Sequence, residues 1–453
     1  MLRSSAVAAV IRAVGLAVVF LLHILLARLA VDATSYGVFA WSQNLLFLLG
    51  SLFALGIPIM ASRLAAVQVY RGDSAGLRRV SSTAHGCVLA ISLAGAGAGL
   101  LILWSLPPEL FSGLSREAIS LAVLAAPVVS LTMLRQALAR AASRLFSAFV
   151  PTQVLRPLLT GLLALGALLL LQRPLTALDM LAALTLSLLL VLLIQVLWGA
   201  SRPLLVNPEA PGADAGAVAA REAPVAAGQG DTAPGAASQT DATPGAIGLL
   251  RQSMPVFATR LADIVMTYGN TLLLGLIGGP LAAASFFVAD RLAQLAAIPG
   301  SVTSAVIQPW LASAHAQGDQ ARLQRVVTQA AHVALWPSLF GGLALFLAGP
   351  WLLELFGGDF AAALPVLGAL LVAQVSGALF GPCHQVLVMS GRQRQVMRLT
   401  LLAAVLHLLL VALLIPAMGA LGAALGSIAS SLLLAIGCWW LVRREYDLRT
   451  TVF

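Results

Sequence analysis

The chain has 453 residues, of which 60% are hydrophobic and 9% are charged, and its formal net charge is +9. A soluble domain cannot bury that much apolar surface, so the composition excludes one and indicates a polytopic membrane protein. The positive charge follows from the membrane topology described below, so we expect no nucleic-acid partner.

Apolar segments long enough to cross a bilayer recur along the whole chain. A transmembrane helix needs about 20 predominantly apolar residues. Twelve segments meet this length, so we predict an all-α fold with twelve transmembrane helices. Their approximate ranges are 6–30, 37–60, 85–106, 117–134, 150–171, 176–199, 252–277, 281–306, 330–349, 361–388, 396–416 and 418–442.

The distribution of arginines predicts the orientation of these helices. All 26 basic residues are arginines, and they concentrate in alternate loops. With the N-terminus inside, 21 of them, including Arg156, fall on the inner side, three fall outside, and Arg260 and Arg291 lie within spans. Because positive residues accumulate in cytoplasmic loops, both termini are predicted to be cytoplasmic.

A change of composition divides the chain into two halves. Residues 201–250 are rich in Ala, Gly, Pro, Asp and Thr, so we predict a disordered cytoplasmic linker there. It separates a six-helix lobe at 1–200 from a second six-helix lobe at 251–453. Gly72–Ala84 matches Gly318–Ala330 at seven of thirteen positions. This repeat predicts two pseudo-symmetric lobes with a transport path between them.

The second span and the loop after it contain residues that shape helices. Gly56 and Pro58 lie in the inner half of the span, where we expect a bend. Asp73 in the loop is suited to cap the N-terminus of a helix. The residues that follow it predict a short amphipathic helix on the inner membrane surface.

Polar residues form stripes on the seventh and eighth spans. A charge in the bilayer core is costly, so it normally faces a protein interior or a hydrated cavity. Regular helical spacing places each set on one face, which predicts such a cavity. The first stripe is Arg260, Asp263, Thr267 and Asn270, and the second is Asp290, Gln294, Ser301, Ser304 and Gln308, with Arg291 beside it.

Each of these charged groups also has a structural interpretation. Arg260 with Asp263, and Asp290 with Arg291, are spaced to form ion pairs that stabilise the second lobe. In the first span, Arg12 and Arg28 are placed to extend toward the two membrane interfaces. His23 lies in mid-span, where either an interhelical hydrogen bond or a functional role is expected.

The chain shows no signature of an enzyme or of a cofactor site. Cys87, Cys383 and Cys438 fall in predicted spans and lack metal-ligand spacing. No nucleophile–base pair and no phosphate-cradling glycine loop is visible in the sequence. We therefore expect a protein without enzymatic activity, bound metal or cofactor.

Several short motifs, in this order, resemble a family of membrane transporters. Ala289-Asp290-Arg291-Leu292 followed by Pro299 and Gln308-Pro309 is similar to span eight of the lipid-linked oligosaccharide flippases. These flippases share a superfamily with the multidrug and toxic compound extruders. Further similar motifs are Arg12 and Gly15, Arg28, Tyr36-Gly37 and Gly56 in the first lobe, and Leu355-Phe356-Gly357 with Phe360, Ser390-Gly391-Arg392 and Leu414-Ile415-Pro416 with Gly419 in the second.

The resemblance implies a flippase that moves polyprenyl-pyrophosphate-linked oligosaccharides across a bacterial inner membrane by alternating access. Such an O-antigen or exopolysaccharide flippase would contact membrane lipids and polysaccharide assembly proteins and act as a monomer, with H+ or Na+ coupling left open. The alternative is a cation-coupled multidrug or metabolite antiporter, but the first span has no acidic residue. The expected substrate-binding residues are Arg12, Arg28, Asn44, Arg260, Asp263, Asn270, Asp290, Arg291 and Gln294.

We expect the linker to be dispensable, because its composition does not support packing. Residues 210–241 can be replaced with a short Gly/Ser spacer, and export can then be measured in complemented cells that carry normal levels of the protein. We expect export at the level of the intact chain. Loss of export despite correct insertion in the membrane would show that the linker has a role of its own.

Overall fold

The structure is a computed structural model, which describes residues 2–201 except 112 and 143, and residues 245–450 except 301, 302, 304–306, 308–310, 312–319, 391 and 447–449. These residues form helices joined by short connections. In the described part of the chain, eight helices are long and apolar enough to cross a membrane, and the last of them is kinked.

The first lobe contains six spans, two of which are built from more than one helix. The second span consists of two helices, and the fifth span contains a π-helical turn, Pro151–Leu155, between its two helices. The helices are α1 (Leu2–Leu29), α2 (Ala33–Phe53), α3 (Ile57–Arg71), α4 (Ser74–Ser105), α5 (Arg116–Ala141), α6 (Leu145–Val150), α7 (Arg156–Leu171) and α8 (Ala177–Ser201).

The second lobe repeats this plan. Its helices are α10 (Ala246–Ile277), α11 (Pro280–Ala296), α13 (Gln320–Leu347), α14 (Gly349–Glu354), α15 (Leu364–Leu379), α16 (Cys383–Met389) and α17 (Gln393–Tyr446). A 3-10 turn at Gly358–Ala363 precedes α15. The helix α17 contains the last two spans, because Gly419 interrupts it at φ 55° and ψ −132°.

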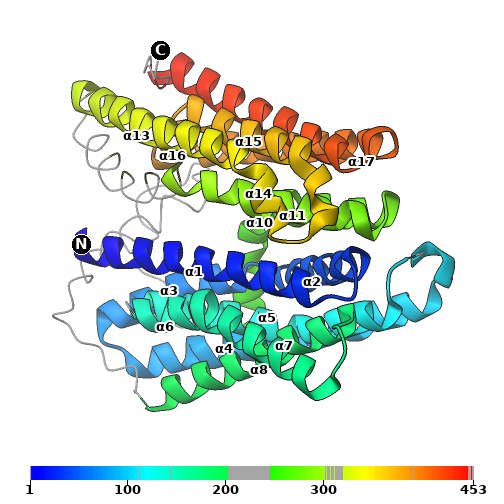
Figure 1. Ribbon diagram of the computed structural model, residues 1–453. Helices are drawn as coiled ribbons and strands as arrows, with labels where there is room; N and C mark the ends of the chain where they lie inside the picture. Colours follow the sequence, from blue (N-terminus) through cyan, green and yellow to red (C-terminus); the bar gives the residue numbers. More distant parts are fainter. Residues whose placement is uncertain are drawn as a thin grey trace.

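Figure 1 shows the two lobes as two layers of nearly aligned helices. The first lobe, in blue to teal, lies below, and the second lobe, in yellow to red, lies above, with α10 and α11 in green at their boundary. Both termini lie at the left end of the bundle, which is the arginine-rich end. The predicted all-α, twelve-helix, two-lobe fold is thus confirmed, with both termini on one side.

The expected bend in the second span is present. Leu55 and Gly56 adopt positive φ values of 45° and 71°, and Pro58 follows at the start of α3. Glycine adopts this left-handed conformation without the steric penalty of a Cβ atom. A similar break separates α15 from α16, where Gly381 has a φ of 67°. One long span in each lobe is therefore broken near the arginine-rich end.

The predicted surface helix after Asp73 is wrong in one respect. Asp73 does cap a helix, since its Oδ1 atom accepts hydrogen bonds from the backbone N–H groups of Ala75 and Gly76 at 3.0 and 2.8 Å. The helix does not end at the membrane surface, however, but continues as the 32-residue α4. No proline interrupts the backbone hydrogen bonds between the amphipathic start and the apolar span, so the helix continues through both.

The predicted linker and part of the predicted repeat lie outside the described residues. Residues 202–244 are not described, and α10 begins at Ala246, before the predicted boundary at Arg251. Of the repeat, Gly318 and Asp319 are outside the description. The helices that follow the two copies, α4 and α13, begin at Ser74 and Gln320, which are equivalent positions in the alignment.

The largest cluster of buried side chains lies in the outer half of the molecule and includes both lobes. It joins α1, α2, α5 and α8 to α11, α15 and the middle of α17. Two smaller clusters lie at the arginine-rich end. One, around Val327 and Leu387, belongs to the second lobe, whereas the other, around Ile57 and Ala84 of the first lobe, also includes Leu249 of α10. The lobes therefore share their largest core at the outer end, and α10 also packs against the first lobe at the inner end.

We expect the close packing of α2 on α5 to depend on Gly50. A Cβ atom there would lie 2.5 Å from Val129 Cγ1, and the Gly50 carbonyl accepts a hydrogen bond from Ser130 at 2.8 Å. Replacement with Ala should lower the free energy of unfolding by about 1–3 kcal/mol through overpacking. Thermal unfolding in detergent measures the change.

The matched control for this variant is Gly86→Ala on α4, since a Cβ atom at Gly86 meets no other atom within 4 Å. That change should leave stability equal or raise it by about 0.5–1 kcal/mol, because alanine favours the helix. Equal melting temperatures for the two variants would contradict the packing argument.

Candidate functional site

The lobes meet along α2 on one side and α10 and α11 on the other. Gly37 of α2 approaches Pro280 so closely that a Cβ atom would collide with the Pro280 carbonyl group. The Trp41 indole donates a hydrogen bond from Nε1 to the Leu272 carbonyl of α10 at 2.9 Å. Small residues let helix backbones approach in this way. This part of the boundary between the lobes is called the outer seam below.

Aromatic rings close the outer seam. His23 of α1 lies edge-on to Phe287 of α11 with ring centroids 4.9 Å apart. The Tyr36 hydroxyl lies 3.3 Å from His23 Nδ1, and the Tyr36 ring contacts Phe360 of the second lobe at 6.0 Å between centroids. His23 and Tyr36 are almost fully buried, so this layer excludes water. The mid-span histidine thus has an interhelical hydrogen bond.

Arg28 connects the lobes at the outer end of the seam. Its guanidinium donates from Nε to the Leu355 carbonyl at 2.8 Å and from Nη2 to the Glu354 carbonyl at 2.6 Å. Both acceptors are backbone groups that follow α14, in the second lobe. Arg28, predicted to contact substrate, therefore lies beyond the aromatic layer and holds the seam together.

On the inner side of the outer seam, α10 has a polar face that is not covered by protein. The Arg260 and Asp263 side chains form an ion pair at 3.4 Å and are 58% and 53% exposed. Thr267, one turn further along the helix, is also exposed. His384 of α16 is exposed and close enough to interact electrostatically with both charges. Exposed charges within a span require a hydrated space, so this face borders a water-filled opening.

At the inner edge of the outer seam, three polar side chains of α11 are hydrogen-bonded to one another. Gln294 donates from Nε2 to Asp290 Oδ2 at 2.7 Å and accepts from Arg291 Nη1 at 3.1 Å. The glutamine thus bridges the acid and the base that were expected to form an ion pair. The Arg291 guanidinium lies over the Phe287 ring at 4.5 Å, and its buried Nε has no hydrogen-bond partner among the described residues.

Arg156 was predicted on the inner side of the membrane, but the structure places it inside the helix bundle. Arg156 begins α7 inside a 26-residue apolar span, Phe146–Leu171, and its guanidinium lies over the Phe47 ring of α2 at 5.0 Å. It is close enough to Arg291 for the two charges to repel, and Tyr268 of α10 interacts with both. The π-helical turn before it, which draws the residue into the bundle, has no clear sequence signature.

These residues form what we call the arginine cluster: Arg156, Arg291, Asp290, Gln294 and Tyr268. It brings one arginine from each lobe together with a single carboxylate, so its formal charge is positive. The guanidinium groups present paired donors suited to phosphate or carboxylate. No group of His, Cys, Asp and Glu in the described part of the chain has the geometry to hold a metal ion.

Two of the remaining candidate residues have hydrogen-bond partners outside the arginine cluster. Asn44 is buried and donates to the Ala40 carbonyl of its own helix at 2.9 Å. Asn270 donates to Ser427 Oγ of α17 at 3.0 Å, inside the second lobe. Arg12 belongs to α1, but its side chain is outside the described residues, as are Ser301, Ser304 and Gln308 of the second stripe. The helical period identified polar faces, but neighbouring helices cover part of each face.

The sequence matches no protein-family profile and no curated protein. Solved structures share the fold. The inward-facing conformation of a multidrug resistance MATE family transporter of the MOP superfamily superposes with a TM-score of 0.74 at 15% identity, over 97% of this chain and 98% of that one. A MOP superfamily transporter from Pyrococcus furiosus, whose title reports reverse polarity of its binding pocket, gives 0.64 at 14% identity, over 98% and 95%.

The outward-facing conformation of a MATE family transporter of the MOP superfamily shares the fold as well, with a TM-score of 0.58 at 15% identity, over 98% of this chain and 95% of that one. At these identities the comparisons establish the fold of the chain.

We expect Arg28→Ala to loosen the outer seam. Its two hydrogen bonds to the second lobe contribute about 0.5–1.5 kcal/mol each, so losing them should shift the equilibrium toward seam opening by roughly tenfold. A single cysteine at Ala284, which is fully buried against Gly37, reports the opening in a chain without native cysteines. Its labelling rate by a membrane-impermeant thiol reagent added outside should rise.

Arg173→Ala serves as the control, because Arg173 is also on the outer side but pairs with Asp179 of its own lobe at 2.9 Å. It should leave the labelling rate unchanged. Equal rates in the Arg28 variant and the intact chain would show that the aromatic layer alone closes the seam.

Proposed function

We propose that this protein is a flippase for polyprenyl-pyrophosphate-linked oligosaccharides, used in O-antigen or exopolysaccharide synthesis in a bacterial inner membrane. The observation that carries the proposal is the arginine cluster, in which Arg156 of the first lobe and Arg291 of the second repel each other beside one carboxylate. A pyrophosphate bound between them would relieve that repulsion. A cation would meet the same repulsion from both lobes.

The chemistry of arginine supports a phosphate ligand. A guanidinium stays charged when partly buried and donates paired hydrogen bonds to phosphate oxygens. Arg291 has an unpartnered Nε, which is available for such a bond. Both guanidinium groups lie on aromatic rings, Phe47 and Phe287, which hold their planes in place without using their N–H donors. The cluster is therefore preorganised for an anion.

The water-filled opening beside α10 fits the other parts of this substrate. Arg260, Asp263, Thr267 and His384 offer hydrogen-bond donors and acceptors to sugar hydroxyl groups on the water-filled side. The polyprenyl chain would remain in the bilayer, against the apolar outer faces of the lobes. The substrate is thus divided among a charged, a polar and a lipid environment.

Alternating access follows from the position of the arginine cluster at the inner edge of the outer seam. Binding of an anion that engages both lobes stabilises the states in which Arg156 and Arg291 are close. The substrate can shift the equilibrium only by its differential affinity for the two conformations. Opening of the seam at His23, Tyr36 and Phe287 would then expose the pyrophosphate to the outer side. Monomeric action suffices, with polysaccharide assembly proteins as further partners.

A cation-coupled multidrug antiporter is the second candidate, since solved structures of multidrug transporters share the fold. In this chain the carboxylates available in mid-span are Asp263 and Asp290 of the second lobe, whereas no acidic residue lies within 2–31. Coupling to H+ or Na+ would have to use one of these two. Asp263 is paired with Arg260 and Asp290 with Gln294, which weakens both as free cation ligands.

We expect Arg156→Ala and Arg291→Ala each to lower export of the lipid-linked glycan at least about tenfold, since hydrogen bonds to charged groups contribute about 1.5–3 kcal/mol. Export is measured in proteoliposomes that contain equal amounts of folded protein. Lysine at either position keeps the charge but not the paired donors, so export should be intermediate.

The matched control is Arg325→Ala, an exposed arginine at the start of α13 that should leave export unchanged. Full export by both alanine variants would remove the arginine cluster from the substrate path. Transport of an organic cation that survives both arginine changes and is lost in Asp290→Asn would support the antiporter instead.

A further inference from the structure

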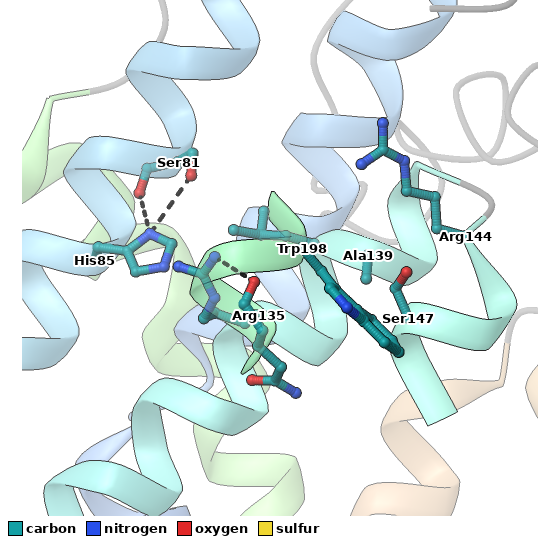
Figure 2. A pocket seen from close by; sticks show the side chains of 9 residues that line it. Ser81, His85, Arg135, Ala139, Arg144, Ser147 and Trp198 are labelled. Carbon is teal, nitrogen blue, oxygen red and sulfur yellow. Dashed lines mark hydrogen bonds between the residues drawn. The ribbon is translucent and has the colours of Figure 1, made fainter. Parts of the chain in front are cut away.

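A basic pocket lies within the first lobe, at its arginine-rich end. It is separate from the arginine cluster at the lobe boundary. It is a cavity of about 190 Å³ between α4, α5, α6 and α8. Its lining includes His85, Arg135, Arg144, Gln195 and Trp198 (Figure 2). No residue of the second lobe lines it, so it is separate from the transport path between the lobes.

Arg135 gives the pocket a fixed positive charge. Its guanidinium donates from Nη2 to the Gln195 carbonyl of α8 at 2.8 Å, which is its one hydrogen-bond acceptor among the described residues. Figure 2 shows the guanidinium extending toward the His85 ring, and the two groups interact electrostatically. Trp198 lies beside Arg135, and Arg144 stands across the pocket from His85. Four of the five guanidinium N–H groups are therefore left for a ligand.

Polar atoms buried in the pocket wall lack partners. The Gln195 side chain is only 7% exposed, yet neither its Nε2 nor its Oε1 atom has a hydrogen bond among the described residues. His85 Nε2 is also buried and unpartnered, while its Nδ1 faces the Ser81 carbonyl at 2.7 Å. Buried polar groups are nearly always satisfied in folded proteins. Because the Ser81 carbonyl accepts from Nδ1, the Nε2 atom of the neutral His85 ring is an acceptor. One donor, Gln195 Nε2, and two acceptors beside an arginine fit a ligand that carries both phosphate oxygens and hydroxyl groups.

The surface around the pocket is apolar and faces the bilayer. Phe146, next to the lining residue Ser147, is 65% exposed, and Leu193 and Leu197 of α8 are 52% and 55% exposed. Acyl chains can lie against these side chains while a headgroup enters the pocket. Basic pockets between transmembrane helices on the cytoplasmic side are suited to anionic lipid headgroups.

We propose that this pocket binds the headgroup of an anionic phospholipid from the cytoplasmic leaflet. Its phosphate accepts hydrogen bonds from Arg135, and its polar headgroup substituent satisfies the Gln195 amide. Because α4, α5, α6 and α8 all contribute to the lining, the bound lipid contacts all four helices and stabilises their packing at the inner end of the first lobe. A ligand that binds only the folded chain raises its free energy of unfolding with the logarithm of the ligand concentration over its Kd.

The test uses the full chain in detergent, to which phosphatidylglycerol or phosphatidylcholine is added. Native mass spectrometry measures bound lipid, and thermal unfolding measures stabilisation. We expect retention of phosphatidylglycerol over phosphatidylcholine, and a loss of affinity of about tenfold or more in Arg135→Gln. Ser147→Phe, which fills the pocket but keeps both arginines, should cause a similar loss.

Arg78→Gln is the matched control, because Arg78 is an exposed arginine at the same end of α4 and does not line the pocket. It should bind lipid as the intact chain does. Undiminished lipid binding by folded Arg135→Gln and Ser147→Phe would overturn the proposal. If inorganic phosphate or glycerol phosphate stabilised the chain as much as phosphatidylglycerol does, the anion would not have to come from a lipid. If phosphatidylcholine were retained as well as phosphatidylglycerol, the pocket would not recognise an anionic headgroup. Either result would overturn the proposal.

Discussion

The continuous hydrophobic core at the outer half of the molecule is the constraint on which the rest of the structure depends. It joins side chains of both lobes into one cluster, which the Gly37–Pro280 approach and the rings of His23, Tyr36 and Phe287 complete. At the arginine-rich end the buried side chains form two smaller clusters, one of which joins Leu249 of α10 to residues of the first lobe. Burial of apolar surface is non-directional, so the same lobes can be joined at either end when the packing between them changes.

Charges in the span regions lie where this core ends. The bilayer cannot solvate them, so each must contact a protein partner or water. Arg28 donates hydrogen bonds to backbone carbonyls, and Asp263 forms an ion pair with Arg260 beside the opening. Asp290 accepts a hydrogen bond from Gln294. Arg156 and Arg291 have rings beneath them and repel each other across the lobe boundary. The positive charge at the lobe boundary is the feature that distinguishes an anion path from a cation path.

The helix breaks fit the same division into an inner and an outer half. Leu55–Gly56 in the first lobe and Gly381 in the second interrupt spans near the inner end. Gly56 also lies directly against α10, since a Cβ atom there would be 3.0 Å from the Phe257 backbone nitrogen. The break at Gly56 therefore lies at a contact between the two lobes. A broken helix changes angle more easily than a continuous one.

The sequence by itself determined the properties that depend on one helix at a time. The apolar segments, the two-lobe helical fold and the bend at Gly56 all follow from composition and local chemistry, and the structure shows the fold and the bend. Which polar side chains meet was decided only by tertiary packing. Arg156 was expected on the inner side of the membrane and lies inside the bundle. Asn44 and Asn270 were expected to bind substrate, and their side chains donate to the Ala40 carbonyl and to Ser427 Oγ. Helical periodicity gives the face of a residue, whereas the neighbour that covers this face depends on how distant helices cross.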